Sequence, residues 1–203
     1  MENSKAYLNF KKQINKVGVS RKDGYNPRLI EEIYEWERNE VEEIIWKCFC
    51  EKNDIDMSIF MPKLRNFSGI KKLEEKLSVS NIPSEQSAII SMVLFELDED
   101  DRYLEIMKKN IKLEPDNIAN VSRLSYCKPC KKIYDTLVDI YINSDNDVMR
   151  DTAVTGILYN KGIITNPHDF MEVIKNMELI RKFDSDNVLK RTDIIEKFEN
   201  NQL

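Results

Sequence analysis

Apolar residues recur along most of this chain at intervals of three and four residues, the spacing that places side chains on one face of an α-helix. The clearest example is EVEEIIWKCFCEK, residues 40–52, whose apolar stripe consists of Val41, Ile44, Ile45, Cys48 and Phe49. Similar stripes occupy residues 149–157 and 170–177. No segment has the pattern of a β-strand, and only five Gly and six Pro are present to form hairpin turns. The pattern therefore predicts an all-α protein.

One segment is apolar around most of its circumference: SAIISMVLFEL, residues 87–97. A helix of this kind must be covered on more than one side, so we place it inside a stack of helices. The polar stretches at 98–101 (DEDD) and 144–147 (SDND) have the length of turns between antiparallel helices. These features predict helices of roughly 10–15 residues that pack as pairs.

Two of these pairs resemble each other at an offset of 65 residues, with Ala88 aligned to Ala153. The amphipathic segment GIKKLEEKLSV (69–79) precedes the first alanine helix, and KKIYDTLVDIYIN (131–143) precedes the second. Repeated helix pairs of this kind bury a continuous core by stacking on one another. We therefore expect residues 1–203 to form a single helical-repeat domain.

The stretch IYDTLVDIYINSDNDVMRDTAVTGIL (133–158) resembles a HEAT repeat, in which an apolar helix and an acidic turn precede the pattern V-R-x-x-A and a second apolar helix. Met149, Arg150 and Ala153 match that pattern, and Glu85 replaces the arginine in the earlier pair. The resemblance implies an α–α superhelix of stacked antiparallel helix pairs with a right-handed lean, a fold that usually holds another macromolecule along its curved face. It does not imply catalysis. In size, acidity and Lys/Ile/Asn-rich composition the chain is also similar to bacterial immunity proteins that neutralise polymorphic toxins.

The acidic residues are unevenly distributed along this chain of net charge −5. Residues 31–54 carry nine acidic side chains against three basic ones, and ELDEDD at 96–101 adds a second acidic segment. Such surfaces repel nucleic-acid phosphates and attract basic proteins, although acids on helix faces are often simply solvated. A DNA-binding or DNA-repair protein is the alternative, and the basic run available to it consists of Lys5, Lys11, Lys12, Lys16, Arg21 and Lys22.

The cysteines offer a further alternative, because CKPC at 127–130 has the spacing of a thiol oxidoreductase. That chemistry requires a preceding buried strand, and the residues before Cys127 are too polar to form one. A zinc site would also use Cys48 and Cys50, whose side chains point roughly 200° apart on a helix and do not face one ion. We therefore interpret the four cysteines as structural thiols, with Cys48 buried, and expect no metal.

Other catalytic machinery is not evident in the sequence. His168 is the single histidine, and every glycine is isolated, so neither a histidine cluster nor a phosphate-binding loop is available. We expect a protein that is not an enzyme and has no cofactor. The N-terminal residues lack the apolar region of a secretion signal, and no apolar stretch is long enough to cross a membrane. A cytoplasmic location is expected.

The sequence predicts binding of a basic protein, such as a toxin domain, through acidic side chains and one aromatic anchor. Exposed charges contribute to association rate and selectivity, whereas an aromatic side chain contributes affinity. We favour Trp36 as the anchor and place Trp46 in the core. The predicted binding residues are Glu35, Trp36, Glu42, Glu43, Asp98, Glu99, Asp100 and Asp101. If the two acidic segments meet along one edge of the stack, they can mimic the phosphates of a nucleic acid.

Overall fold

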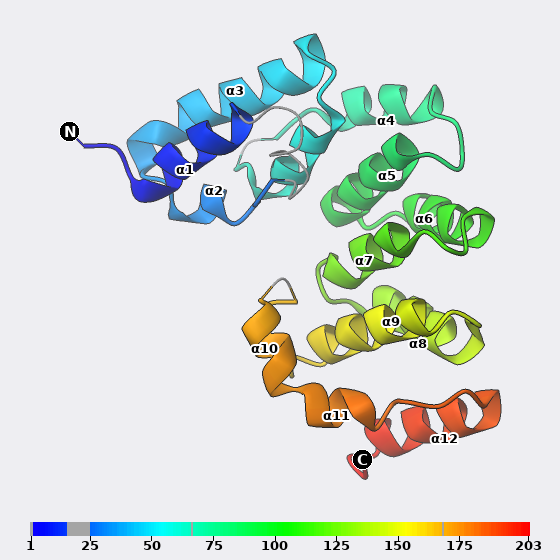
Figure 1. Cartoon of the computed structure of the whole chain (residues 1–203). Helices are drawn as coiled ribbons and strands as arrows, with labels where there is room; N and C mark the ends of the chain where they lie inside the picture. The colour runs from blue at the N-terminus through cyan, green and yellow to red at the C-terminus, as the bar shows by residue number, and fades with distance from the viewer. Residues whose placement is uncertain (1, 16–24, 66, 168) are drawn as a thin grey trace. The chain divides into compact units, whose positions relative to one another are not determined.

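The computed structural model describes residues 2–15, 25–65, 67–167 and 169–203 (Figure 1). Within these ranges the chain is helical and contains no β-strand, which confirms the all-α prediction. By their internal contacts the residues form two compact units, residues 1–104 (unit 1) and 105–203 (unit 2). Each unit is described separately below, and a single domain over 1–203 stays a prediction.

The described part of unit 1 combines α-helices with the 3-10 segments η2 and η3. Their bounds are α1 Lys5–Ile14, α2 Leu29–Glu32, η2 Glu35–Glu37, α3 Arg38–Glu51, η3 Ile55–Lys63, α4 Ile70–Ser78 and α5 Glu85–Asp98. Helix α6, Asp101–Leu113, begins in unit 1 and contains the boundary. The bounds of the helices in unit 2 are α7 Ile118–Tyr126, α8 Lys131–Asn143, α9 Asp147–Asn160, α10 Phe170–Lys175, α11 Met177–Arg181 and α12 Val188–Glu199.

The core of unit 1 forms where α3 and α5 pack on η3. The stripe predicted for residues 40–52 is largely buried, with Val41, Ile45 and Phe49 inaccessible to solvent. Helix α1 joins this core through Phe10, whose ring meets that of Phe60 edge-on at 5.5 Å between centroids. The apolar stripe thus predicted α3 correctly, and its partner is the 3-10 segment η3.

Helix α5 occupies the interior position that its apolar circumference predicts. It begins at the capping residue Ser84, whose hydroxyl accepts a hydrogen bond from the amide of Ser87 at 3.0 Å. Its largely inaccessible apolar side chains are Ala88, Ile89, Ile90, Val93, Leu94 and Phe95. The helix ends at Glu99, which adopts a left-handed conformation with φ of 54°. Helix α4 packs on α5, so the first of the two predicted pairs is present in unit 1.

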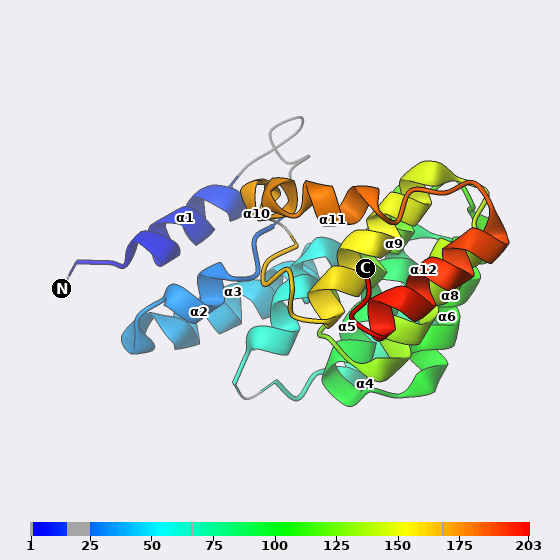
Figure 2. The same ribbon diagram turned by 90° about the horizontal axis from the view of Figure 1, so that it is seen from below.

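Unit 2 is built around the second predicted pair, α8 and α9, with α7 packed on α9 (Figure 1). Gly156 marks the closest approach, because a Cβ atom placed there would lie 2.7 Å from Ser125 Oγ and 2.8 Å from Leu137 Cδ1. Small residues at such points let neighbouring helices approach closely. Helix α12 then packs on α8 (Figure 2), which extends the stack by a further layer, and α11 makes a smaller contact with α9.

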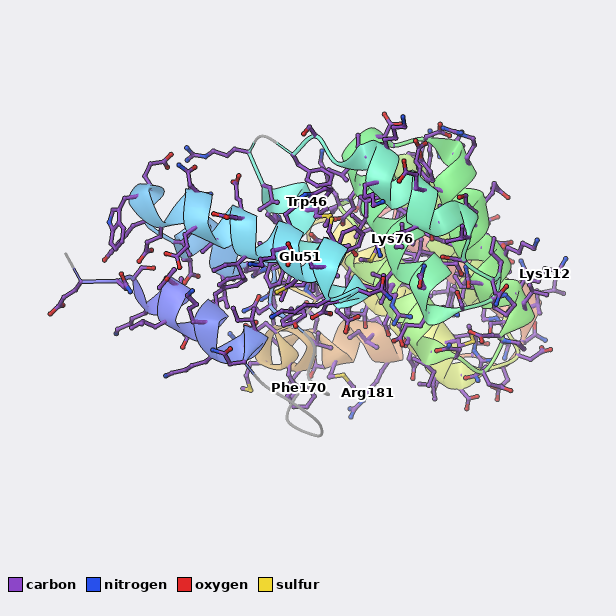
Figure 3. All side chains as sticks on the ribbon, turned by 90° about the horizontal axis from the view of Figure 1, so that it is seen from above. Trp46, Glu51, Lys76, Lys112, Phe170 and Arg181 are labelled. Atoms are coloured by element: carbon purple, nitrogen blue, oxygen red, sulfur yellow. The ribbon has the colours of Figure 1, made fainter. Side chains whose placement is uncertain are left out.

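Helices α10 and α11 contribute little to this stack, since neither contains a buried residue. Figure 3 shows Phe170 projecting from α10, and its side chain is 74% exposed. The segment is instead held at its two ends, where Ile164 and Phe183 are buried. The apolar stripe at 170–177 therefore predicted helix correctly but not a core position.

Two buried arginines connect the turns that precede α9 and α12. Arg150, the arginine of the HEAT-like pattern, donates to the carbonyl of Ser144 at 3.2 Å and to Asp186 Oδ1 at 3.0 Å. Arg191 donates to the carbonyls of Ile142 at 2.8 Å and Ser185 at 3.1 Å. Each arginine thus bonds one carbonyl of its own turn; Arg150 also reaches Asp186 in the other turn, and Arg191 also reaches Ile142 in the last turn of α8. We call residues 144–147 and 184–187 the paired turns.

The paired turns reveal a repeat that the 65-residue offset did not include. Ser144-Asp145-Asn146 and Ser185-Asp186-Asn187 are followed by Arg150 and Arg191, each four residues after its asparagine. Both asparagine side chains cap a helix, accepting hydrogen bonds from the amides of Met149 and Lys190. The pattern S-D-N-x-x-x-R therefore encodes one turn structure twice.

Candidate functional site

The candidate site lies at the η2 turn of unit 1 and depends on a buried carboxylate that the sequence did not single out. Glu37 is 1% exposed, and its oxygens accept hydrogen bonds from Ser4 N at 2.8 Å, Ser4 Oγ at 2.6 Å and Tyr34 N at 2.8 Å. Burial alone would raise the pKa of Glu37, but these hydrogen bonds outweigh it and lower the pKa. An ionised carboxylate therefore fastens the start of α1 to the η2 turn.

A second carboxylate repeats this contact one turn further along. Glu40 accepts hydrogen bonds from Lys11 Nζ and Tyr7 Oη, both at 2.8 Å. The Lys11 contact is the main cause of the lowered pKa of Glu40, and the same contact raises the pKa of Lys11. Ser4, Tyr7 and Lys11 lie on one face of α1, so the two glutamates hold this helix along its length.

The turn fixed by Glu37 presents two aromatic side chains to solvent. Tyr34 is 52% exposed and Trp36 is 49% exposed, and their ring centroids are 6.2 Å apart. The residues beside them, Ile33 and Glu37, are buried, so the backbone of the turn is anchored on both sides. An aromatic pair on an anchored turn loses little conformational entropy when a partner covers it. Trp36 therefore has the exposure that an anchor requires.

Trp46 lies between core and surface. It is 37% exposed, and its ring is 6.0 Å from Phe49 and 5.9 Å from Phe67, measured between centroids. Its indole also covers Gly69, where an added Cβ would lie 2.5 Å from the ring. Figure 3 shows Trp46 on α3. The predicted core position is therefore wrong, because Trp46 packs on Phe49, Phe67 and Gly69 but stays exposed to solvent.

Most acidic side chains of residues 31–54 make ion pairs or hydrogen bonds within unit 1. Glu31 pairs with Lys63 at 2.7 Å, and Glu35 pairs with Arg65 at 2.7 Å. Glu37 and Glu40 hold α1. Among the described residues, Glu42 and Glu43 on α3 make neither a hydrogen bond nor an ion pair with their side chains, and Glu43 is exposed. We define the aromatic–acidic face as Tyr34, Glu35, Trp36, Glu42 and Glu43.

The second predicted acidic segment, Asp98, Glu99, Asp100 and Asp101, has its own set of partners at the turn between α5 and α6. Asp100 accepts hydrogen bonds from the amide and Nε of Arg102, both at 2.8 Å. Arg102 also approaches Glu74 of α4 at 3.8 Å. The contacts described for this turn include no residue of the aromatic–acidic face, so one acidic edge formed by both segments stays a prediction.

The thiols of CKPC lie at the junction of α7 and α8. Cys127 is inaccessible to solvent and its sulfur lies 3.4 Å from the carbonyl of Arg123, whereas Cys130 is half-buried at the start of α8. The prediction that Cys48 is buried is confirmed, and all four cysteines are free thiols. The end of α7 turns Cys127 into the core. The residues before it form a helix and not the strand of a redox fold.

Several other candidate residues are outside the described ranges: Lys16, Arg21, Lys22 and His168. Of the remaining basic run, Lys11 is paired with Glu40, and Lys5 and Lys12 are exposed. In the described part of the chain, no three His, Cys, Asp or Glu side chains are arranged to hold a metal ion. No helix in those ranges has the length and apolar character needed to span a membrane.

Comparison with known proteins found no family model, curated protein or solved structure that matches this chain. What the site can do follows therefore from its own chemistry. The fixed aromatic pair offers apolar contact area, and Glu42 and Glu43 on the helix that follows it in sequence offer negative charge, a combination suited to basic partners.

Lowering the pH should weaken the attachment of α1. The pKa values of Glu37 and Glu40 are lowered from an ordinary value of 4.5, so their contribution to stability is complete above that value. The contribution is lost as the pH falls through the lower pKa values of the folded state. We expect the free energy of unfolding by urea, followed by circular dichroism, to decrease between about pH 5 and about pH 3.

The variant Glu37→Gln tests the source of this dependence. At pH 7 it should lower the free energy of unfolding by about 1–3 kcal/mol, because the amide nitrogen does not accept hydrogen bonds. Its pH dependence should also be shallower than that of the wild type. Glu43→Gln is the control, since Glu43 is exposed and should retain the wild-type dependence. Equal pH dependence in wild type and Glu37→Gln would contradict the assignment.

Proposed function

We propose that this chain is a non-catalytic protein-binding module, a HEAT-like helical-repeat protein that binds a basic partner through the aromatic–acidic face. The partner that fits this proposal best is a toxin domain, which the chain would neutralise as a cytoplasmic bacterial immunity protein. The observation that supports it most is the exposed pair Tyr34 and Trp36 on a turn anchored by buried Glu37. Large aromatic side chains on fixed backbones commonly supply most of the binding free energy of an interface.

The free carboxylates of the face suit a partner of opposite charge. Glu42 and Glu43 lie on α3, close in sequence to the aromatic turn, and Glu35 is 71% exposed even though it pairs with Arg65. Such exposed charges accelerate encounter with a basic surface and contribute less to the final affinity. If the partner is a nuclease, the same carboxylates would occupy the groove that otherwise binds phosphates. Asp98, Glu99, Asp100 and Asp101 would extend this surface.

The stacked pairs in the two units support the helical-repeat part of the proposal. Helix α4 contacts α5 in unit 1 and α8 contacts α9 in unit 2, and a HEAT-like repeat would require such pairs. We propose that the pairs belong to one α–α superhelix, whose role is to hold another macromolecule. In this proposal the aromatic–acidic face binds a partner and catalyses no reaction.

The proposal is tested with the protein encoded directly upstream of this chain, produced alone and together with it in a bacterial host. We expect the upstream protein to stop growth and this chain to restore it, with a complex on size-exclusion chromatography. The double variant Tyr34→Ala/Trp36→Ala should weaken the complex at least about 100-fold, the effect of losing two aromatic anchors. Val79→Ala, an 80% exposed apolar side chain elsewhere in unit 1, is the control and should bind normally.

Charge-reversal variants test separately whether each acidic segment contributes to binding. Glu42→Lys/Glu43→Lys should slow association with the partner and reduce its salt dependence, because both charges steer the encounter. The fourfold reversal of Asp98, Glu99, Asp100 and Asp101 to lysine shows whether that turn belongs to the same surface. Unchanged rates in both variants would overturn the acidic part of the proposal. Absence of any complex, or tight salt-dependent binding of duplex DNA, would overturn the whole of it.

A further inference from the structure

The paired turns of unit 2 carry exposed apolar side chains that have no role in the core. Val148 at the start of α9 is 52% exposed, and Val188 and Leu189 at the start of α12 are 45% and 81% exposed. These residues follow the capping asparagines, where the first helical turn faces outward. A leucine with four fifths of its surface in water contributes little to folding, so this position requires another explanation.

The two helix starts form one surface because the buried arginines hold them together. Arg150 reaches Asp186 at 3.0 Å, Arg191 reaches the carbonyl of Ile142 at 2.8 Å, and Tyr141 Oη donates to the carbonyl of Phe183 at 2.7 Å. Figure 1 shows both turns at the same end of unit 2, opposite α10. The exposed aliphatic side chains therefore lie on a backbone whose two turns are held together by hydrogen bonds from buried side chains.

Carboxylates border these aliphatic side chains. The exposed ones are Asp145, Asp147, Asp151, Asp184 and Asp186. Within the described ranges the first four make neither a hydrogen bond nor an ion pair with their side chains, and Asp186 is bonded to Arg150. Burial, followed by the charge of Asp184, raises the pKa of Asp151 on α9. The positive charges of Arg150 and Arg191 are buried and directed at backbone carbonyls and Asp186.

This arrangement restricts what can cover the surface. The described carboxylates do not converge on a metal-binding geometry. Nucleic acid would be repelled by the five aspartates, and a second copy docking through the same face would bring like charges together. A partner segment with apolar side chains flanked by lysine or arginine can bury the aliphatic side chains and pair with the carboxylates.

We propose that the paired turns are a docking surface for a cationic amphipathic segment of a partner protein. Val148, Val188 and Leu189 contact its apolar side chains, and the surrounding aspartates pair with its lysine or arginine residues. This surface is built from unit 2 alone and does not depend on the aromatic–acidic face. Under this proposal each unit contributes one acidic surface with its own apolar centre.

A synthetic peptide provides the probe. A fluorescent 15-residue peptide with leucine and lysine at helical spacing is titrated with the full chain, and anisotropy is measured at two salt concentrations. The comparison peptides replace each lysine by glutamate or each leucine by serine. We expect binding of the Leu/Lys peptide that weakens with salt, and at least a tenfold loss of affinity for both comparison peptides.

Variants of the chain test whether the Leu/Lys peptide binds at the paired turns. Val148→Ser/Leu189→Ser should weaken the Leu/Lys peptide at least about fivefold. Val79→Ser, which alters an 80% exposed side chain in unit 1, should have no effect. Tyr34→Ala/Trp36→Ala should also leave this affinity unchanged, so failure here is distinguishable from failure of the aromatic–acidic face. Circular dichroism confirms that each variant is folded. The proposal is overturned if the peptide does not bind, or if the serine variant binds it as tightly as the wild type.

Discussion

Replacing Arg191 by alanine should lower the free energy of unfolding by about 2–5 kcal/mol, the range for truncating a long buried side chain. Arg191 is 2% exposed and donates to the carbonyls of Ile142 and Ser185. Alanine leaves both carbonyls without this donor and opens a cavity where the long side chain was packed. Urea unfolding followed by circular dichroism measures the change.

Two further variants separate the causes of this loss. Arg191→Met keeps most of the packed volume but no donor, so it should recover only the part of the stability that comes from filling the cavity. Lys190→Ala removes a long basic side chain from the adjacent exposed position and should change the free energy of unfolding by less than about 0.5 kcal/mol. A loss below about 1 kcal/mol in Arg191→Ala would show that the paired turns do not depend on this residue.

Replacing Gly156 by valine should destabilise the chain by about 2–3 kcal/mol through overpacking. The new side chain would meet Ser125 and Leu137, whose atoms lie 2.7–2.8 Å from the position of an added Cβ. Both neighbours belong to buried helices, so the collision is relieved only by moving α7 or α8 away from α9. The midpoint of urea unfolding should therefore decrease.

Thr155→Val is the matched control, because it places the same side chain one residue earlier at a half-buried position. It should remain within about 1 kcal/mol of the wild type. A second substitution tests whether the valine collides with Ser125. Ser125→Gly removes two of the three atoms nearest to the added Cβ and should restore part of the stability that Gly156→Val loses. Equal losses for Gly156→Val in both backgrounds would contradict the close-packing explanation.

The helices were predictable because their signal is local. The stripe through Val41, Ile45 and Phe49 predicted α3, and the aligned alanines Ala88 and Ala153 predicted two pairs whose second helices are buried. Periodicity of this kind follows from burial of one helix face. It does not specify the partner of that face, and the 3-10 segment η3 against α3 was therefore not predicted.

The candidate site was only partly predictable, because long-range polar contacts have no periodic signature. Trp36 was selected from the sequence and is exposed, but the buried role of Glu37 depends on Ser4, 33 positions away. The same reason explains why the acidic count of residues 31–54 overstated the charge available to a partner. The repeat S-D-N-x-x-x-R was visible in the sequence, and a search for polar rather than apolar repetition would have found it.

Helices α10 and α11 should detach from unit 2 at a lower free-energy cost than global unfolding requires. Neither contributes a buried side chain, while Ile164 before them and Phe183 after them are both in the core. Detachment of the two helices therefore exposes almost no core surface, and its free energy is far smaller than that of global unfolding. Because the connection is pinned at both ends, such local opening leaves the α8–α9–α12 packing in place. Evolution or engineering can lengthen, shorten or split the chain here with little effect on the rest of the fold.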